Sequence, residues 1–407
     1  MEAAINVQPY DDITVPILIE NGTVVLQNEV VQGVAVAVEG AIVSALLNDD
    51  EEIKAWKMKR PNALLVDASE KYVLPGLIDI HCDAIEKEVQ PRPGTLFPTP
   101  LALMEFERKL PLHGITTMYH SLSLGTGFSL RGVHLLTDMV NQIQRHRRGS
   151  VYVRNRIHLR YEISFHDGRD ILEKLLDEEN VHYLSFMDHS PGQGQYRKPG
   201  SFQRYVMKNQ GVTVDEVAVI VDELMERRKR VDYTWLKSIV QKAASQGIAI
   251  ASHDDDSPEL VARQQDLGVT VSEFPINLET ARYAAESGMY VCVGAPNVVR
   301  GSSHDDNLRA VDAIKAGAAH ILCSDYHPSS LLAAIFKLAN EGTAELPAAV
   351  AMASLRPAEA MGLQQKLGSI ATGKAADLIL VELFQGMPRV TNTIVGGSLV
   401  YSACTRH

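Results

Sequence analysis

Apolar runs recur along the middle of the chain, and amphipathic segments of helical period separate them. The runs predict eight strands, over residues 77–80, 115–119, 157–162, 182–187, 248–252, 269–272, 290–293 and 320–324. Helices are expected between them, for example over 135–148, 235–245 and 308–316. Strands that alternate with helices are typical of a parallel α/β sheet, and eight of them favour a (β/α)8 TIM-like barrel.

Both ends of the chain carry a different pattern, of short strands separated by turns. Residues 17–25 contain an Asn-Gly turn signal, 34–43 have a hairpin pattern, and three short runs follow residue 376. Neither end is long enough to form a core alone, so we expect the two to pair into one small β-domain. The predicted division assigns residues 1–74 and 366–407 to the β-domain and 75–365 to the barrel.

Composition narrows the class of protein. A length of 407 residues suits a barrel with an appended domain, and 45% hydrophobic residues with 22% charged residues are typical of a globular protein. No apolar run approaches the roughly 20 residues that cross a bilayer, and the first residues lack the pattern of a signal peptide. The four cysteines form no CxxC pair, so we expect a reducing, cytoplasmic location.

The net charge of the chain bears on which molecules the protein can bind. A net charge of −11 argues against nucleic-acid and anionic-membrane partners, which clustered Lys and Arg would bind. It is compatible with a small anionic substrate held at a local positive site. We also expect a homo-oligomer.

Side chains that bind metals follow five of the eight predicted strands. They are His81 and Asp83, Glu162, His189, His253 and Asp325. All strands of a parallel barrel open their carboxyl ends onto one face, so these side chains are expected to converge. His81 and Asp83 are two residues apart on a strand and therefore point to the same side. Imidazole with carboxylate suits Zn²⁺ first, with Mn²⁺ or Fe²⁺ as alternatives.

Two stretches resemble the amidohydrolase superfamily, namely residues 73–83, as its opening strand, and 368–378, as its closing segment. A closer similarity is to the α-D-ribose 1-methylphosphonate 5-triphosphate diphosphatase family of the carbon–phosphorus lyase pathway, which releases the 5-phosphate and pyrophosphate. The stretches that carry it span nearly the whole barrel: 81–83 with 86–87 and 91–93, 158–162, 187–193, 251–255, 272–275, 294–301 and 324–328.

The resemblance implies roles for the predicted ligands. His81 and Asp83 would form the first ligand pair, and Glu162 would be the bridging carboxylate. His189 and His253 would complete a second metal position, although the superfamily's usual places are the fifth and sixth strands and the predicted ones are the fourth and fifth. Asp325 would bind the first metal and take the proton of the bound water, because a bound cation lowers the pKa of that water to about 7. Asp325 and His253 are the predicted catalytic residues. The sequence does not decide whether the site holds one metal ion or two.

Basic residues in the same stretches are predicted to bind the substrate. A triphosphate carries about four negative charges, and its transfer is catalysed mainly by positioning and charge neutralisation. Arginine donates bidentate hydrogen bonds to phosphate oxygens. The predicted substrate contacts are Lys87, Arg92, Arg160 and Arg300, with Asn297 in a segment whose backbone amides face the substrate.

The chain also departs from the family pattern, at His120, Asp305, Asp306 and His327, and His304 is a further possible pocket residue. These side chains are expected near the mouth of the barrel and leave the exact substrate open. The runner-up function is an amidohydrolase acting on a C–N bond, a deaminase or cyclic-amide hydrolase, because the same activated water attacks carbon or phosphorus. A non-catalytic scaffold is disfavoured, since all six ligand positions are filled.

Overall fold

Eight parallel strands form the centre of the molecule. The computed structural model describes residues 15–92, 94–125, 133–196, 200, 202–203, 206–207, 213–303 and 307–403. The eight strands neighbour one another in chain order. They are β8 (Leu77–Cys82), β9 (Ile115–Leu124), β10 (Arg154–Glu162), β11 (Tyr183–Met187), β12 (Ala249–His253), β13 (Val271–Glu273), β14 (Tyr290–Gly294) and β15 (Ile321–Cys323). The predicted strand count is confirmed.

Backbone hydrogen bonds close the ring of strands. The Asp325 N–H donates to the His81 carbonyl at 2.9 Å, and the Asp83 N–H donates to the Asp325 carbonyl at 2.8 Å. These bonds join the end of β8 to the segment after β15, and the predicted barrel class is confirmed. Closure also fixes three of the predicted ligand residues beside one another.

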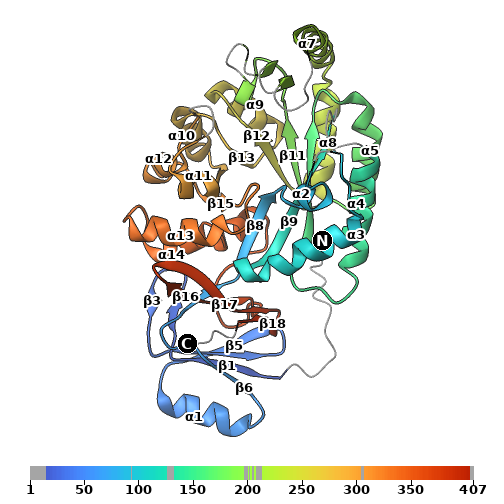
Figure 1. Cartoon of the computed structure of the whole chain (residues 1–407). Helices are drawn as coiled ribbons and strands as arrows, with labels where there is room; N and C mark the ends of the chain where they lie inside the picture. Colours follow the sequence, from blue (N-terminus) through green and yellow to red (C-terminus); the bar gives the residue numbers. More distant parts are fainter. Residues whose placement is uncertain are drawn as a thin grey trace.

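Helices surround the barrel (Figure 1). They are α2 (Ile85–Val89), α3 (Thr99–Lys109), α4 (Val133–His146), α5 (Arg169–Asp177), α8 (Tyr233–Ser245), α9 (Pro258–Leu267), α10 (Leu278–Glu286), α11 (Ala295–Arg300), α12 (Ala310–Lys315), α13 (Ser330–Asn340), α14 (Leu346–Ala351) and α15 (Leu355–Ala360). In α4 the residues Leu136, Met139, Val140 and Ile143 recur at helical spacing and are all buried. Both faces of the sheet are therefore covered, which is why β9 is buried along its whole length.

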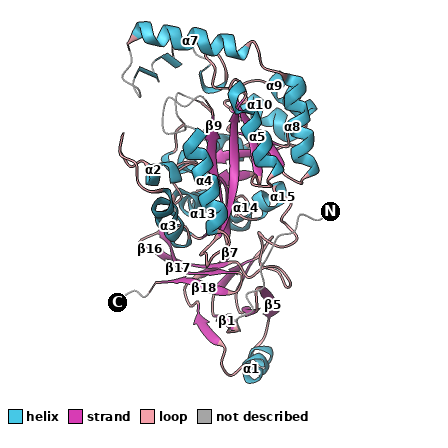
Figure 2. Cartoon of the chain, turned by 90° about the vertical axis from the view of Figure 1, so that its right-hand side faces the viewer, coloured by secondary structure: helices cyan, strands magenta, loops and turns pink. Residues whose placement is uncertain are grey.

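One helix projects beyond the ring. Helix α7 (Val214–Arg228) belongs to the polar insert after β11 and lies at the end of the barrel away from the small domain (Figure 2). It begins with a capping box, in which Thr213 and Glu216 satisfy each other's backbone N–H groups. Phe202, Val206, Val217 and Leu224 form a small apolar cluster of the insert.

Both chain ends build the small β-domain, as expected, and it contains two sheets. One sheet has the order β5-β4-β1-β6 and the other β18-β17-β16-β7-β2-β3. Strand β7 (Tyr72–Pro75) pairs antiparallel with β16 (Leu378–Phe384), which joins the two ends. The other strands are β1 (Ile17–Glu20), β2 (Thr23–Val25), β3 (Val30–Val31), β4 (Ala35–Glu39), β5 (Ile42–Leu47), β6 (Leu64–Asp67), β17 (Met387–Val395) and β18 (Ser398–Ser402). Helix α1 (Asp50–Lys59) packs Trp56 against the four-stranded sheet.

The chain divisions predicted at residues 74 and 365 stay predictions. Within the described residues, no helix has the length and apolar character needed to cross a membrane.

Candidate metal centre

The six predicted ligand residues all lie at the carboxyl ends of barrel strands. His81 is in β8 and Asp83 follows it, while Glu162 and His253 are the last residues of β10 and β12. His189 lies two residues beyond β11, and Asp325 two residues beyond β15. His189 thus follows the fourth strand and His253 ends the fifth. The predicted strand positions of these two residues are thus the observed ones, while their roles as metal ligands stay predictions.

The backbone turns sharply at three of these strand ends. Asp254, Phe274 and Asp325 have φ values of 58°, 55° and 58°. A positive φ is unfavourable for residues other than glycine, and such residues concentrate at functional sites. Here the turns come directly after β12 and β13 and just after β15.

Two groups of three residues bring ligand atoms within 4.8 Å of one another. One contains His189, His253 and Asp254, and the other contains His81, His158 and Glu273. We call the first the outer group, because the His189 side chain is 26% exposed. The second is the inner group, because its three members are at most 1% exposed. Asp254, His158 and Glu273 were not among the predicted ligands.

The outer group fits a divalent cation. Asp254 Oδ2 lies 3.2 Å from His253 Nδ1 and 4.0 Å from His189 Nε2. This buried oxygen nevertheless accepts no hydrogen bond from any described residue. A carboxylate oxygen close to two imidazoles is a donor set for Zn²⁺ or a similar metal. Glu162 supports this group, since its Oε2 accepts the His189 N–H at 3.2 Å and lies 3.2 Å from His189 Nδ1.

Arg160 lies at the centre of the ligands. Its Nη2 is 3.1 Å from His253 Nε2, and its Nη1 is 3.9 Å from Asp83 Oδ2. A guanidinium only donates, so His253 Nε2 accepts here, and a cation gains that nitrogen only after Nη2 moves away. The Arg160 Nε is buried and has no hydrogen-bond partner in the described part of the chain. Arg160 therefore supplies positive charge beside the carboxylates of Asp83, Asp254 and Asp325.

Asp325 combines burial with a like-charged neighbour. Burial, and then the carboxylate of Asp83, raise the pKa of Asp325 to about 7, while the Arg160 charge opposes the rise. Burial and neighbouring charges also act on the pKa of Asp254, but there the neighbouring positive charges outweigh burial. Burial alone would raise its pKa, but the charges of His253, His189 and Arg160 together lower it.

The inner group is a chain of hydrogen bonds beneath the mouth. Glu273 Oε1 accepts from His81 Nδ1 and from the Tyr183 hydroxyl, each at 2.9 Å. His158 contacts the hydroxyls of Ser121 at 3.0 Å and Ser185 at 2.9 Å. Burial lowers the pKa of His158 well below its usual value, so this ring is neutral. Glu273 directly follows the sixth predicted strand, which is the signal that singled out the six predicted ligands, but its contact with His81 is not visible in the sequence.

Three of the predicted phosphate contacts lie on the surface. Lys87, Arg92 and Arg300 are exposed, and the Lys87 ammonium is 5.2 Å from the centre of the Tyr326 ring. Asn297 has a different local role. Its amide donates to the Leu308 carbonyl and accepts the Ala310 N–H, each at 3.0 Å, and so fastens α11 to the start of α12. Among the predicted contacts, Arg160 is the one buried at the centre.

One expectation about the mouth was wrong. His120 is fully buried between β9 and α3, with its Nε2 2.7 Å from Asn155 Oδ1 and its ring 5.7 Å from that of Phe106. The strand was predicted to end at residue 119, but β9 continues to Leu124, so His120 lies in mid-strand and faces the helices. His327 is exposed and its Nδ1 lies 2.8 Å from the Ser329 hydroxyl. Pro93, His304, Asp305 and Asp306 lie outside the described residues.

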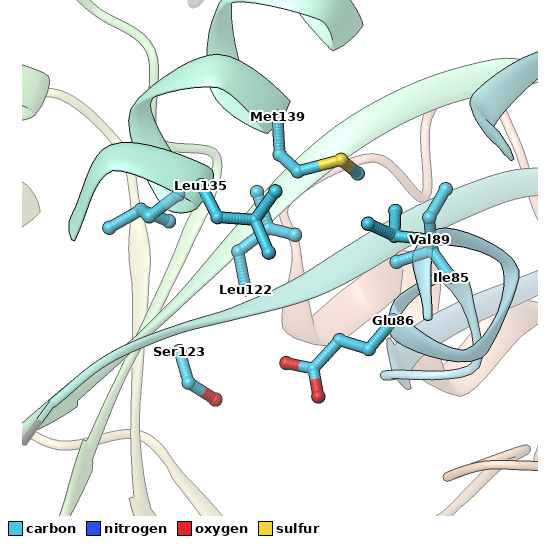
Figure 3. Close-up of a pocket in the computed structure, with 8 residues that line it drawn as sticks. Ile85, Glu86, Val89, Leu122, Ser123, Leu135 and Met139 are labelled. Carbon is cyan, nitrogen blue, oxygen red and sulfur yellow. The ribbon is translucent and has the colours of Figure 1, made fainter. Parts of the chain in front are cut away.

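A separate small hollow lies between α2, α4 and β9. Its lining is mostly apolar, with Glu86 and Ser123 as the polar members (Figure 3). The labelled apolar side chains in that view are Ile85, Val89, Leu122, Leu135 and Met139. Such a lining suits an apolar group and not a polyphosphate.

Comparison with known proteins agrees with this architecture. The amidohydrolase family model matches residues 208–400. The α-D-ribose 1-methylphosphonate 5-triphosphate diphosphatase of Escherichia coli is 33% identical over 369 residues, which cover 89% of this chain and 94% of that protein. The 5′-deoxyadenosine deaminase of Methanobrevibacter smithii is 29% identical over 113 residues, covering 28% of this chain and 22% of that protein.

Solved structures share the fold. N-acetylglucosamine-6-phosphate deacetylase from Pasteurella multocida superposes with a TM-score of 0.64 at 12% identity, over 94% of this chain and 99% of that one. Molinate hydrolase has the same TM-score of 0.64 at 14% identity, over 95% of each chain. At these identities the likeness concerns the fold, whereas the similarity to the diphosphatase runs along nearly the whole sequence. The chain therefore belongs to the amidohydrolase superfamily, whose members generally bind divalent metals, and is a relative of the α-D-ribose 1-methylphosphonate 5-triphosphate diphosphatase.

Proposed function

We propose that this protein is a metal-dependent hydrolase of phosphonate breakdown. Its substrate would be α-D-ribose 1-methylphosphonate 5-triphosphate, and its products the 5-phosphate and pyrophosphate. The observation that carries the proposal is the 33% identity to the diphosphatase, which extends over 89% of this chain. The buried guanidinium of Arg160 among the strand-end ligands supports it, because a polyphosphate needs a positive site inside an acidic protein.

The chain offers residues for one or two cations. His189, His253 and Asp254, with Glu162 beside them, would hold one ion, and His81, Asp83 and Asp325 would hold the other. A bound divalent ion, Zn²⁺ first with Mn²⁺ or Fe²⁺ as alternatives, supplies a water of pKa about 7 and neutralises phosphoryl charge.

The chain's own residues have distinct tasks in this reaction. Asp325 accepts the proton of the attacking water, as a carboxylate at the closure of the ring. The His253 side chain lies between the metal position and Arg160, and it keeps the reacting phosphoryl group in place there. Arg160 donates to a non-bridging oxygen of the scissile phosphoryl group, while Lys87, Arg92 and Arg300 neutralise the outer phosphates. The Asn297 side chain keeps α11, and with it Arg300, in place.

Product analysis tests the proposal. Metal-loaded protein is incubated with the ribose 5-triphosphate that bears the 1-methylphosphonate, and the products are resolved by ³¹P NMR. Release of pyrophosphate with the 5-phosphate is the expected result. No turnover by protein with metal demonstrably bound would overturn it.

The second candidate is hydrolysis of a C–N bond. The local similarity to 5′-deoxyadenosine deaminase favours it, although that match covers 28% of this chain. Ammonia release from adenosine nucleosides, without pyrophosphate release from the triphosphate, would support this candidate instead. The cytoplasmic location and the homo-oligomer stay predictions.

A further inference from the structure

The carboxylate of Glu273 lies where it decides which nitrogen of His81 faces the metal position. We propose that Glu273 is a positioning residue, which with Tyr183 fixes the proton of His81 on Nδ1 and leaves Nε2 as the ligand atom. The inference rests on the metal centre of the proposed function. Neither Glu273 nor Tyr183 is among the six predicted metal ligands.

The hydrogen bonds allow one assignment of the His81 proton. At 2.9 Å, His81 Nδ1 lies at hydrogen-bond distance from Glu273 Oε1, and an ionised carboxylate only accepts. The Tyr183 hydroxyl donates to the same oxygen, also at 2.9 Å, so its proton is already used. His81 must then donate from Nδ1, which leaves the lone pair on Nε2.

His158 does not compete for this carboxylate. The Ser121 hydroxyl accepts the Cys82 N–H at 3.0 Å and is thereby oriented to donate to His158 Nδ1. The proton of the neutral His158 ring is then on Nε2, where Ser185 Oγ lies at 2.9 Å and Glu273 Oε1 only at 3.9 Å. His158 therefore has both nitrogens occupied by serine hydroxyls and offers no lone pair to a metal.

Packing holds the His81 ring in this orientation. The Phe274 and His158 rings contact it edge to face, with centroid distances of 4.9 and 5.0 Å. Phe274 directly follows Glu273, at a φ of 55°, so the same turn after β13 places both the acceptor and the packing partner. A ring held in this orientation, with its proton on Nδ1, directs the lone pair of Nε2 away from Glu273.

A carboxylate behind a ligating histidine orients the ring and raises its basicity. Loss of such a partner typically weakens metal binding about tenfold to a hundredfold. The weaker binding is expected for the cation that His81 binds. Metal affinity is therefore the quantity to measure, and turnover changes only as a consequence.

The experiment measures zinc affinity of the whole protein after chelation, by competition with a chromophoric chelator. Glu273→Met removes the acceptor at similar length and should weaken zinc binding at least about tenfold. Glu273→Gln retains an oxygen that accepts the Nδ1 proton and should recover most of the affinity. Tyr183→Phe leaves the His81 contact intact and should have the smallest effect of the three.

A matched control separates positioning from stability. Glu107 in α3 is likewise buried and accepts from His146 Nε2, at 2.7 Å, but it lies in the helix layer. Glu107→Gln should lower the thermal midpoint without changing zinc affinity. A folded Glu273→Met protein that binds zinc as tightly as wild type would overturn the inference alone. Wild-type protein that binds no divalent cation would overturn the metal centre itself, and this inference with it.

Discussion

The outer and inner groups contain the same kinds of side chain and differ in what completes them. In the inner group, hydrogen bonds of 2.9–3.0 Å connect His81, Tyr183 and His158 to Glu273 or to serines. In the outer group, Asp254 Oδ2 lies between two imidazoles without a donor among the described residues, and Arg160 takes a histidine nitrogen. The inner group is held together mainly by its own hydrogen bonds, although Glu273 Oε2 has no partner among the described residues. In the outer group, both Asp254 Oδ2 and His253 Nδ1 lack a hydrogen-bond partner in the described part of the chain. The outer group therefore leaves more ligand atoms available to a cation than the inner group does.

The largest effect on turnover is expected at Asp325, which lies at the closure of the ring of strands. Asp325→Asn removes the proton acceptor but keeps an oxygen ligand, so turnover should fall at least about a hundredfold while most of the metal stays bound. Steady-state rates and metal content of the same preparation measure the two quantities. Wild-type turnover in this variant would remove Asp325 from the reaction.

The next largest effect is expected on metal content, at Asp254. Asn tolerates the positive φ of this position, so Asp254→Asn changes the charge without forcing the backbone to move. One cation should be lost or bound at least about tenfold more weakly, as measured by metal analysis after dialysis. Asp266→Asn, at an exposed position of α9, is the control. Unchanged metal content in Asp254→Asn would show that the outer group is complete without a cation.

The sequence predicted the barrel and the strand-end positions of the six candidate ligands because both depend on local order along the chain. An apolar run followed by His, Asp or Glu is visible without knowing the neighbours. The inner group was missed because it depends on which strand ends face each other across the ring. Glu273 and His81 are 192 residues apart, and only the closed barrel brings them together. His120 was misplaced for a local reason, since an error of five residues in the end of β9 turned a mid-strand residue into a mouth residue.

Arg160 gives a smaller effect that sharpens the comparison. Arg160→Gln removes the guanidinium group, whose charge neutralises Asp83 and Asp325. It also removes the donor that occupies His253 Nε2 in competition with a metal ion. The chelated variant should be less stable than chelated wild type. Its thermal midpoint should rise on zinc addition by at least about 2 °C more than that of wild type. Turnover should fall as well, because a phosphoryl contact is lost.

Arg300→Gln is the matched control for this measurement. Arg300 is exposed at the end of α11, so its replacement should lower activity without changing the zinc-induced shift. An equal shift in Arg160→Gln and wild type would contradict the competition between the guanidinium and the cation.

The smallest effect on activity is expected for His120, which is enclosed like the inner group but lies among the helices. Burial lowers the pKa of His120 to about 4, below the 6.5 of an unfolded histidine. The unfolded chain therefore binds the proton first, and stability present above pH 6.5 is lost as the pH falls toward 4. The contribution amounts to about 3 kcal/mol of unfolding free energy. His120→Gln keeps a donor for Asn155, and denaturant unfolding of chelated protein at pH 7 and pH 5 should show a shallower dependence on pH than wild type. Equal dependence would mean that the His120 ring takes up its proton inside the folded protein, and that enclosure by hydrogen bonds alone does not hold a histidine neutral.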